Sequence, residues 1–352
     1  MPTQTVCVLG GGSFGTVLAN IVAGNGFRVN FWMRNEALVE QVNIQRENPQ
    51  YLPGYRLHDQ VTATHDIEAA VAGSRLVFVA VPSAYFRTVV RKMKHAVTDD
   101  TMLVSTTKGI EAGSFLLMSQ VMREELPDAR IGVLSGPNLA GEIAKKSLTG
   151  TVIASASEAV RERVREVLRS EYFRVYTNDD MFGVELGGSL KNIYAIIAGL
   201  AAAMGMGQNT NSMLITRSLT EMARFGRELG ADPMTFLGLA GVGDLIVTCS
   251  SSLSRNFRVG FALGQGKSLK EAVAELGQVA EGVNTLKQVK EKADQLGIYM
   301  PLATGLYRIV YEGMAVEQVI AALMHGEGAL DVEYEANQSK KLTGARACPT
   351  TS

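Results

Sequence analysis

The feature that most constrains the fold of this chain is a glycine-rich segment that follows its first apolar run. Residues 5–9 (TVCVL) read as a short strand, and residues 10–15 (GGGSFG) lead into a helical pattern. In such a strand–turn–helix unit, the first glycine allows a tight turn, the second lets a pyrophosphate approach the backbone, and the third lets helix and strand pack closely. Gly10, Gly12 and Gly15 hold these positions. The sequence therefore predicts an α/β sheet whose first turn binds a dinucleotide at a helix N-terminus.

The residue after the second predicted strand bears on which dinucleotide is bound. That strand covers residues 29–33 and is followed by Arg34. An acidic side chain at this place accepts hydrogen bonds from the ribose of NAD, whereas an arginine suits the 2′-phosphate of NADP. Arg34 therefore favours NADPH. A plain surface arginine is the alternative, and the nearby Glu36 keeps NAD open.

Strand and helix patterns alternate through the first half of the chain, which indicates a mostly parallel sheet covered on both faces. Residues 48–57 (NPQYLPGYRL) contain Pro and Gly and read as a loop. Two last strands extend the sheet in mixed orientation, and the domain closes near residue 180. Strands are predicted at residues 61–64, 76–81, 102–106, 131–134, 151–154 and 173–176, and helices at 67–72, 84–95, 115–125 and 158–170.

Three polar motifs follow strands of this sheet, at residues 81–83 (VPS), 106–109 (TTKG) and 135–138 (SGPN). Ligands of open α/β sheets bind beyond the carboxyl ends of the strands. The motifs are therefore candidates for the walls of a cleft. Lys108 is placed at this cleft, with a solvated loop lysine as the alternative.

A long apolar stretch, residues 184–206, carries leucine and isoleucine at steps of three and four, which predicts a buried helix. Lys191 lies among small residues such as Gly187 on another face of it. A buried ammonium is costly unless it is paired, and burial lowers the pKa of a lysine, so Lys191 is the candidate catalytic residue. The alternative is a lysine that reaches the surface or forms a structural ion pair. Glu185 and Asn192, on a third face, are placed to brace the site.

The second half of the chain shows helical patterns and almost no strand signal. Residues 241–244 (GVGD) read as a tight glycine turn that ends in an acid. Ser254, Arg255 and Asn256 open a helix, and an arginine with small donors and free N–H groups suits an anion. An ordinary helix cap with an exposed arginine is the alternative. Helices are predicted at residues 211–229, 234–239, 257–265, 269–276, 284–296, 302–310 and 316–324.

Composition excludes several classes of protein. The formal net charge of -1 argues against nucleic-acid binding through a broad basic surface. The three cysteines are far apart and lack metal-ligand spacing, so we expect neither a disulfide framework nor a metal site, and a reducing cytoplasm fits. We expect no targeting signal and no membrane span, because the apolar helix carries charged residues. The sequence leaves a homodimer open.

Together these motifs resemble those of bacterial NAD(P)-dependent sn-glycerol-3-phosphate dehydrogenases, over about residues 4–335. Members of that family often carry Trp or Tyr where Phe14 stands, and Ser or Thr where Asn138 stands. The motifs that carry the resemblance are GGGSFG at 10–15, AVPS at 80–83, TKGIE at 107–111, SGPNLAGE at 135–142, ELGGSLKN at 185–192, GVGDLIVT at 241–248, SRNFRVG at 254–260 and AEGV at 280–283.

The resemblance implies a fold and a division of the chain. The fold is α/β, with an N-terminal Rossmann-type, mostly parallel sheet followed by an all-helical C-terminal domain, as in 6-phosphogluconate-dehydrogenase-like proteins. We expect an NAD(P)-binding domain at residues 1–180, a helical substrate domain at 181–335 and a disordered tail at 336–352. The cofactor implied is NADP or NAD, with NADPH preferred and no metal.

The resemblance also implies roles for individual residues. Lys191 is the proton donor and acceptor in the interconversion of dihydroxyacetone phosphate and sn-glycerol 3-phosphate, which supplies phospholipid synthesis in the cytoplasm. The substrate-binding residues implied are Lys108, Gly136, Asn138, Lys191, Asp244, Ser254, Arg255 and Asn256. The cofactor-binding residues, with the glycines of the first turn, are Gly10, Gly12, Ser13, Phe14, Gly15, Arg34, Lys108, Ala140, Arg255, Val279 and Glu281.

Two other functions remain open at this point. One is a similar two-domain dehydrogenase that acts on a β-hydroxy acid or a hydroxyacyl thioester. The anion loop at residues 254–256, together with Lys108, favours a small phosphate ester instead. The other is a non-catalytic protein that senses NAD(P), which would have no need of Lys191 among small residues.

Overall fold

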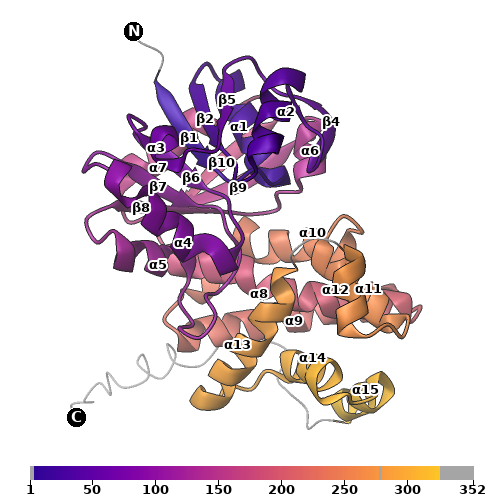
Figure 1. The fold of residues 1–352 in the computed structure, drawn as a ribbon. Coiled ribbons are helices and arrows are strands. Elements are labelled where there is room, and N and C mark those ends of the chain that lie inside the picture. The colour runs from indigo at the N-terminus through magenta and orange to yellow at the C-terminus, as the bar shows by residue number, and fades with distance from the viewer. Residues whose placement is uncertain (1–3, 277–279, 326–352) are drawn as a thin grey trace, which may run out of the picture.

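The structure is a computed structural model, and it describes residues 4–276 and 280–325. An α/β part, with strands from residue 5 to residue 178, lies against a bundle of helices that begins with α8, Met181–Ala203 (Figure 1). The predicted boundary at residues 180 and 181 thus falls between the last strand and α8. The division into two domains and the tail at 336–352 stay predictions, and the tail lies outside the described residues.

One eight-stranded sheet forms the α/β part, in the order β10-β9-β8-β7-β6-β1-β2-β5. The six strands β8, β7, β6, β1, β2 and β5 run parallel to one another. The strands β9 and β10 are parallel to each other, and β9 pairs with β8 in antiparallel orientation. The predicted mixed orientation is therefore confirmed. The strands are β1 (Thr5–Leu9), β2 (Arg28–Trp32), β5 (Val61–Thr64), β6 (Leu76–Val79), β7 (Met102–Ser105), β8 (Arg130–Ser135), β9 (Thr149–Ala154) and β10 (Phe173–Asn178).

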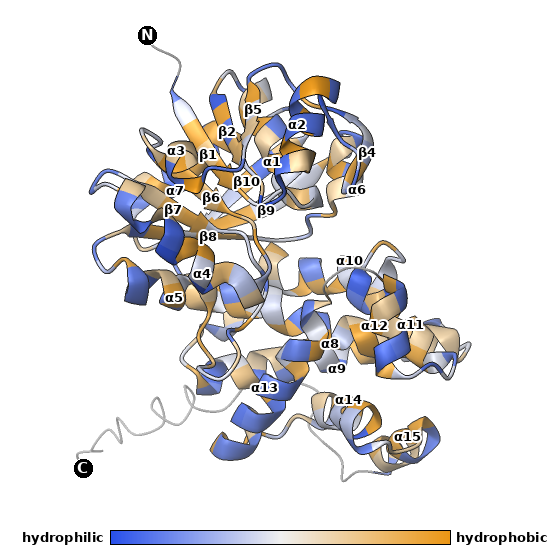
Figure 2. Cartoon of the chain, viewed as in Figure 1, coloured by the Kyte–Doolittle hydropathy of each residue, from blue (hydrophilic) through white to orange (hydrophobic). Residues whose placement is uncertain are grey.

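Alternating side chains of each strand divide the apolar interior into two cores. In β1, Val6 and Val8 belong to one core, and Cys7 and Leu9 belong to the other. Figure 2 shows hydrophobic strands between helices with hydrophilic outer sides. The first core is covered by α1 (Ser13–Gly24), α2 (Glu36–Gln45), α6 (Ala140–Ala144) and α7 (Glu158–Leu168), and the second by α3 (Ile67–Val71), α4 (Ser83–Met93), η1 (Lys94–Ala96) and α5 (Met118–Glu125).

The segment predicted as a loop at residues 48–57 is instead an antiparallel hairpin of β3, Glu47–Asn48, and β4, Leu52–Arg56. Pro and Gly within the second strand disguised it, because neither residue favours a strand. Such a short two-stranded sheet is marginal alone, so contacts with the rest of the protein must hold it. Those contacts reach the glycine turn, as described below.

The second part consists of helices packed around α8. Between residues 181 and 325 the described residues form helices and turns and no strand. The predicted glycine turn at 241–244 is instead helical, because a π-helical turn runs directly into α10. The elements after α8 are α9 (Gln208–Glu228), η2 (Pro233–Leu237), η3 (Leu239–Gly243), α10 (Asp244–Ser250), α11 (Arg255–Gly264), α12 (Leu269–Leu276), α13 (Glu281–Leu296), α14 (Pro301–Glu312) and α15 (Val316–Met324).

Helix α8 is the centre of this part, and glycines let its neighbour α11 approach it closely. A Cβ atom on Gly260 of α11 would lie 1.8 Å from the carbonyl oxygen of Ile196, and one on Gly199 would lie 2.0 Å from that of Phe257. By length and composition, α8 is apolar enough to cross a membrane, although it carries the charged residues noted in the sequence. However, 83% of its apolar window is buried inside the protein.

Candidate active site

A buried carboxylate joins the two lysines that the sequence singled out. Lys191 projects from α8, and its Nζ lies 2.8 Å from Oδ1 of Asp244. Lys108 follows β7, and its Nζ lies 2.6 Å from Oδ2 of the same carboxylate. Asp244, the first residue of α10, is only 1% exposed and Lys191 5%. The geometry thus brings two ammonium groups and one carboxylate together where the sheet meets the helical part.

The electrostatics of this group are dominated by burial and by its own charges. The pKa of Lys108 is lowered to about 8, chiefly because burial disfavours the charged form; the carboxylate of Asp244 opposes this shift, and the positive charge of Lys191 adds to it. The predicted like-charge repulsion between the two lysines is present. The role of Asp244 as the counter-charge between the lysines is not predictable from local patterns, because Asp244 is far in the sequence from both Lys108 and Lys191.

Thr248 is a member of the group that the sequence argument did not identify. Its hydroxyl accepts a hydrogen bond from Lys191 Nζ at 2.5 Å and donates to the carbonyl oxygen of Asp244 at 2.6 Å. Thr248 lies four residues after Asp244, and residues at this spacing share one face of a helix. The spacing of Asp244 and Thr248 therefore indicates that they share a helix face, but only once residues 244–250 are recognised as helix α10.

The segment that carries Lys108 is held by side chains of the helical part. Asn192 Nδ2 donates to the carbonyl oxygen of Lys108 at 3.4 Å, and Gln288 Nε2 donates to that of Ile110 at 3.2 Å. Ser189 Oγ donates to the intervening Gly109 carbonyl at 3.3 Å. Three consecutive carbonyls are thus fixed, which restricts where the Lys108 side chain can lie. The expected bracing role of Asn192 is confirmed.

Glu185, which was also expected to brace the site, instead contacts another helix. Its carboxylate accepts hydrogen bonds from the N–H and hydroxyl of Ser119, in the first turn of α5. Burial raises the pKa of Glu185 to about 7, and the hydrogen bonds from Ser119 oppose that shift. This expectation was wrong because Glu185 lies on the part of α8 that faces α5.

The start of α11 places the predicted anion-binding residues next to one another. Ser254 caps the helix, with Oγ accepting from the N–H of Phe257 at 3.3 Å, and Arg255 is exposed at the first turn. Asn256 is buried, and its Nδ2 donates to Oδ1 of Asn192 at 2.9 Å. Asn192 thereby links α11 to the segment of Lys108.

The motif after β8 forms another wall of the same site. Lys108 Nζ donates to the carbonyl oxygen of Gly136 at 2.8 Å. Gly136 has a φ of +143°, and a Cβ there would lie 3.2 Å from Cα of Thr151, so only glycine fits without strain. Asn138 donates to Thr151 Oγ1 at 2.9 Å, and its Oδ1 is buried without a partner among the described residues. Ala140 begins α6 and packs against the sheet.

The glycine turn fits a dinucleotide. A Cβ on Gly10 would lie 2.3 Å from the carbonyl oxygen of Ala80, and one on Gly15 would lie 2.0 Å from that of Gly10, so both positions require close packing. At Gly12 a Cβ would meet nothing within 4 Å, which leaves the backbone open to a ligand. No side chain caps α1, so its first N–H groups are available to phosphate oxygens.

The remaining cofactor candidates lie around this turn. Phe14 packs against the sheet core, and Ser13 Oγ donates to the carbonyl oxygen of Tyr51 at 2.7 Å. Arg34 is exposed after β2, with its guanidinium 5.2 Å from the ring centre of Tyr85.

A second candidate region joins the start of α4 to the start of α13. Glu281 accepts hydrogen bonds from the N–H of Ser83 at 3.0 Å and from its hydroxyl at 2.6 Å. This carboxylate therefore connects the helical part to the carboxyl end of β6. Val279 lies outside the described residues.

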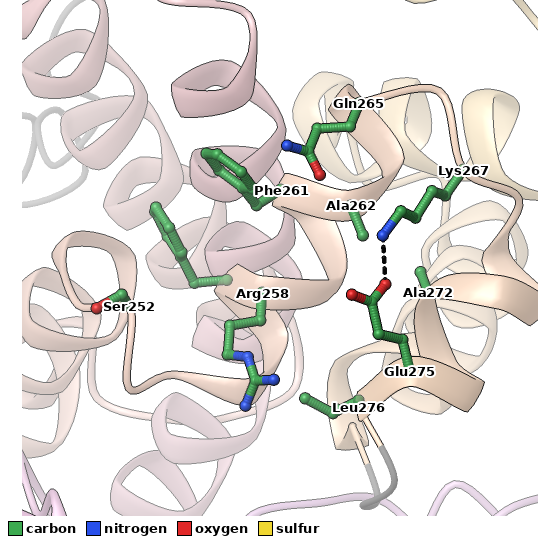
Figure 3. Close-up of a pocket in the computed structure, with 10 residues that line it drawn as sticks. Ser252, Arg258, Phe261, Ala262, Gln265, Lys267, Ala272, Glu275 and Leu276 are labelled. Carbon is green, nitrogen blue, oxygen red and sulfur yellow. Dashed lines mark hydrogen bonds and ion pairs between the residues drawn. The ribbon is translucent and has the colours of Figure 1, made fainter.

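Among the described residues, no group of three or more His, Cys, Asp or Glu side chains is arranged to hold a metal ion. A pocket of about 350 Å³ lies between α11 and α12, where Phe261, Arg258 and the ion pair of Lys267 and Glu275 line it (Figure 3). None of the predicted site residues lines that pocket.

A glycine turn at the first strand of a Rossmann-type sheet, with a helical part attached through a buried cluster of two lysines and an aspartate, is the arrangement of an NAD(P)-dependent dehydrogenase. The sequence profile described as the NAD-dependent glycerol-3-phosphate dehydrogenase N-terminus matches residues 5–161, and that of the C-terminus matches residues 180–321. The chain belongs to this family of NAD(P)-dependent oxidoreductases.

Individual relatives agree with this assignment. Proteins named glycerol-3-phosphate dehydrogenase [NAD(P)+] from Azotobacter vinelandii and Pseudomonas entomophila are each 59% identical over 331 residues, covering 94% of this chain and 97% of theirs. The crystal structure of glycerol-3-phosphate dehydrogenase from Coxiella burnetii is 38% identical with a TM-score of 0.88, covering 92% of this chain and 99% of that one. The predicted family and fold class are confirmed.

Proposed function

We propose that the chain catalyses the reversible transfer of a hydride between NAD(P)H and dihydroxyacetone phosphate, giving sn-glycerol 3-phosphate, with NADPH as the preferred cofactor. The observation that carries this proposal is the cluster of Lys108, Lys191 and Asp244 beyond the carboxyl ends of the strands. A ketone needs a proton when it is reduced, and a buried ammonium held in one position can supply it.

In this proposal the nicotinamide cofactor, when bound, supplies the hydride. As the ketone carbonyl is reduced to an alcohol, the ammonium of Lys191 gives its proton to the substrate oxygen. The neutral amine regains a proton afterwards. Lys108 stabilises the negative charge that develops on that oxygen. Asp244 holds both Nζ atoms, at 2.8 and 2.6 Å, so neither lysine has to be ordered during the reaction.

The substrate phosphate is proposed to bind at the start of α11. Arg255 supplies a charged donor. The N-terminus of α11 is the positive end of the helix dipole, and N–H groups of its first turn can donate to an anion there. Ser254 and Asn256 flank Arg255, and Gly136 and Asn138 are proposed to contact the substrate from the loop after β8. Asn138 Oδ1, which has no hydrogen-bond partner among residues 4–276 and 280–325, is an acceptor suited to a substrate hydroxyl.

The cofactor residues are proposed as a set around the first turn. The glycines and the N-terminus of α1 would hold the pyrophosphate, Arg34 the 2′-phosphate, and Glu281 with Lys108 the nicotinamide side. The complete proposed set is Gly10, Gly12, Ser13, Phe14, Gly15, Arg34, Lys108, Ala140, Arg255, Val279 and Glu281.

The cellular setting is proposed from the state of two cysteines. Cys7 and Cys249 are buried free thiols, which suits the reducing cytoplasm. The product is a precursor class for phospholipid synthesis. A homodimer and the lack of membrane insertion stay predictions, and light scattering of the purified protein with and without lipid vesicles tests both.

One assay distinguishes the candidate functions. NADPH oxidation is followed at fixed enzyme with dihydroxyacetone phosphate, dihydroxyacetone, a β-keto acid and a β-ketoacyl thioester. Turnover that requires the phosphate ester supports the proposal. Turnover of the acid or the thioester instead identifies another two-domain dehydrogenase, and cofactor binding without any turnover identifies a sensor.

A further inference from the structure

The β3–β4 hairpin touches the glycine turn directly, although the sequence suggested only a loop there. Asn48 Nδ2 donates to the carbonyl oxygen of Gly11 at 2.8 Å and to Oγ1 of Thr16 at 2.8 Å. Ser13 Oγ donates to the carbonyl oxygen of Tyr51 at 2.7 Å. The glycine turn belongs to the unit β1–α1–β2, and the hairpin therefore holds it from outside that unit.

The Asn48 amide can lie in only one orientation. The carbonyl of Gly11 accepts and cannot donate, so it requires the NH₂ group of Asn48. The hydroxyl of Thr16 donates to the carbonyl oxygen of Gly12 at 2.9 Å, which leaves it as an acceptor toward Asn48. Asn48 is 0% exposed, so water does not compete for these contacts.

The position of the Gly11 carbonyl fixes the next N–H. A peptide unit is planar and trans, so its C=O and N–H point in opposite directions. When Asn48 holds the Gly11 oxygen toward the hairpin, the N–H of Gly12 is turned away from the hairpin. Gly12 is the position where the backbone is open, with nothing within 4 Å of a Cβ.

We propose that Asn48 is a positioning residue for the cofactor: it orients the Gly11–Gly12 peptide so that the Gly12 N–H meets the pyrophosphate. This inference rests on the proposed use of NAD(P)H. Because NADH and NADPH share the pyrophosphate, Asn48 should affect both equally. Arg34 differs in this respect, because it is proposed to contact only the 2′-phosphate.

The test compares two Asn48 variants with a matched control. Asn48→Ala removes both donors, and Asn48→Asp keeps the size of the side chain but cannot donate and adds a negative charge near the phosphates. The control is Asn20→Ala, because Asn20 of α1 also holds this hairpin, by donating to Arg56 O at 3.1 Å and accepting from His58 N at 2.6 Å. Asn20 makes neither of the contacts with the turn.

The readout is the Kd of NADPH and of NADH from fluorescence titration, with circular dichroism to show that each variant is folded. We expect Asn48→Ala to raise both Kd values by the same factor, about tenfold for two lost hydrogen bonds, and Asn48→Asp to raise them further. Asn20→Ala should leave both Kd values near wild type. The KM for dihydroxyacetone phosphate at saturating cofactor should stay unchanged in all three.

Three results would overturn the inference. Unchanged Kd values in a folded Asn48→Asp variant would show that the contact with Gly11 does not position the cofactor. Equal losses in Asn48→Asp and Asn20→Ala would assign the effect to hairpin attachment in general. If the wild-type chain binds neither cofactor, the proposed function fails as well, which separates that case from the first two.

Discussion

Lys191 Nζ lies 2.8 Å from Oδ1 of Asp244, inside a protein interior where neither residue is more than 5% exposed. A buried pair of this kind costs desolvation energy that a structural role would rarely justify, because apolar replacements are often as stable. The pair also shares its carboxylate with Lys108. The arrangement is therefore best explained by chemistry that needs ammonium groups at fixed positions.

Lys191→Ala should lower kcat by about 10²–10⁴-fold, the usual contribution of a general acid or base. Lys191→Arg should not restore activity, because a guanidinium stays protonated near neutral pH. Stopped-flow or steady-state NADPH oxidation measures kcat, and fluorescence titration should show that NADPH still binds. A near-wild-type kcat in Lys191→Ala, or loss of its circular dichroism signal, would contradict the proposed role.

Asp244→Asn should lower the pKa of Lys108 below its value of about 8, because the charge that raises it is removed. Lys191→Met should raise that pKa, because a repelling charge is removed. The rate of acylation of Lys108, followed by mass spectrometry across pH 6–10, reports its unprotonated fraction. Midpoints that move in the same direction in both variants would exclude the proposed charge balance.

The fold of the α/β part could largely be predicted, whereas its hairpin could not. The strands and the glycine turn carry local patterns, since alternation of apolar strands and helices is visible within short windows. The strands of the hairpin depend on their pairing with each other and on the contact between Asn48 and the glycine turn. Such stability comes from tertiary contacts, which a local pattern does not contain.

The site, too, could be predicted only in part. Lys108, Lys191 and the start of α11 could be chosen as single candidates, because each lies in an unusual local setting. That Asp244 joins the two lysines depends on how α10 packs against α8, and the misread turn at residues 241–244 hid this helix. Thr248 was missed for the same reason.

Arg255→Ala should raise the KM for dihydroxyacetone phosphate by about 10- to 100-fold, since a charge-assisted hydrogen bond contributes about 1.5–3 kcal/mol. The KM for NADPH should rise less. Arg258→Ala, one turn later on α11, is the matched control and should leave both values near wild type. If the two variants behave alike, Arg255 does not bind the substrate phosphate.

Arg34→Ala should raise the KM for NADPH and leave that for NADH nearly unchanged. Arg34 follows the end of β2, and its guanidinium lies over the ring of Tyr85 in α4. Arg34 is exposed and therefore available to the 2′-phosphate. Arg28→Ala changes an exposed arginine at the opposite end of the same strand and serves as the control. Equal losses for both cofactors would show that Arg34 does not distinguish them.

Glu185→Gln should make the protein more stable at pH 8 than the wild type, although it removes a charge that accepts two hydrogen bonds. Burial raises the folded-state pKa of Glu185 from 4.5 to about 7. The protonated form is thus favoured by folding, and this stabilisation is complete below pH 4.5 and lost as pH rises through 7. A shift of this size corresponds to about 3 kcal/mol.

The measurement for Glu185 is urea unfolding of both proteins at pH 5, 6, 7 and 8. The free energy of unfolding of the wild type, taken relative to Glu185→Gln, should fall from pH 5 to pH 7 and level off toward pH 8, where the carboxylate is ionised in both states. Other titrating groups cancel in the difference. Glu162→Gln, at an exposed carboxylate of α7, should give a difference that does not vary with pH. A pH-independent difference for Glu185→Gln would show that its carboxylate ionises in the folded protein as readily as in the unfolded chain, and that the α8–α5 contact is not proton-linked.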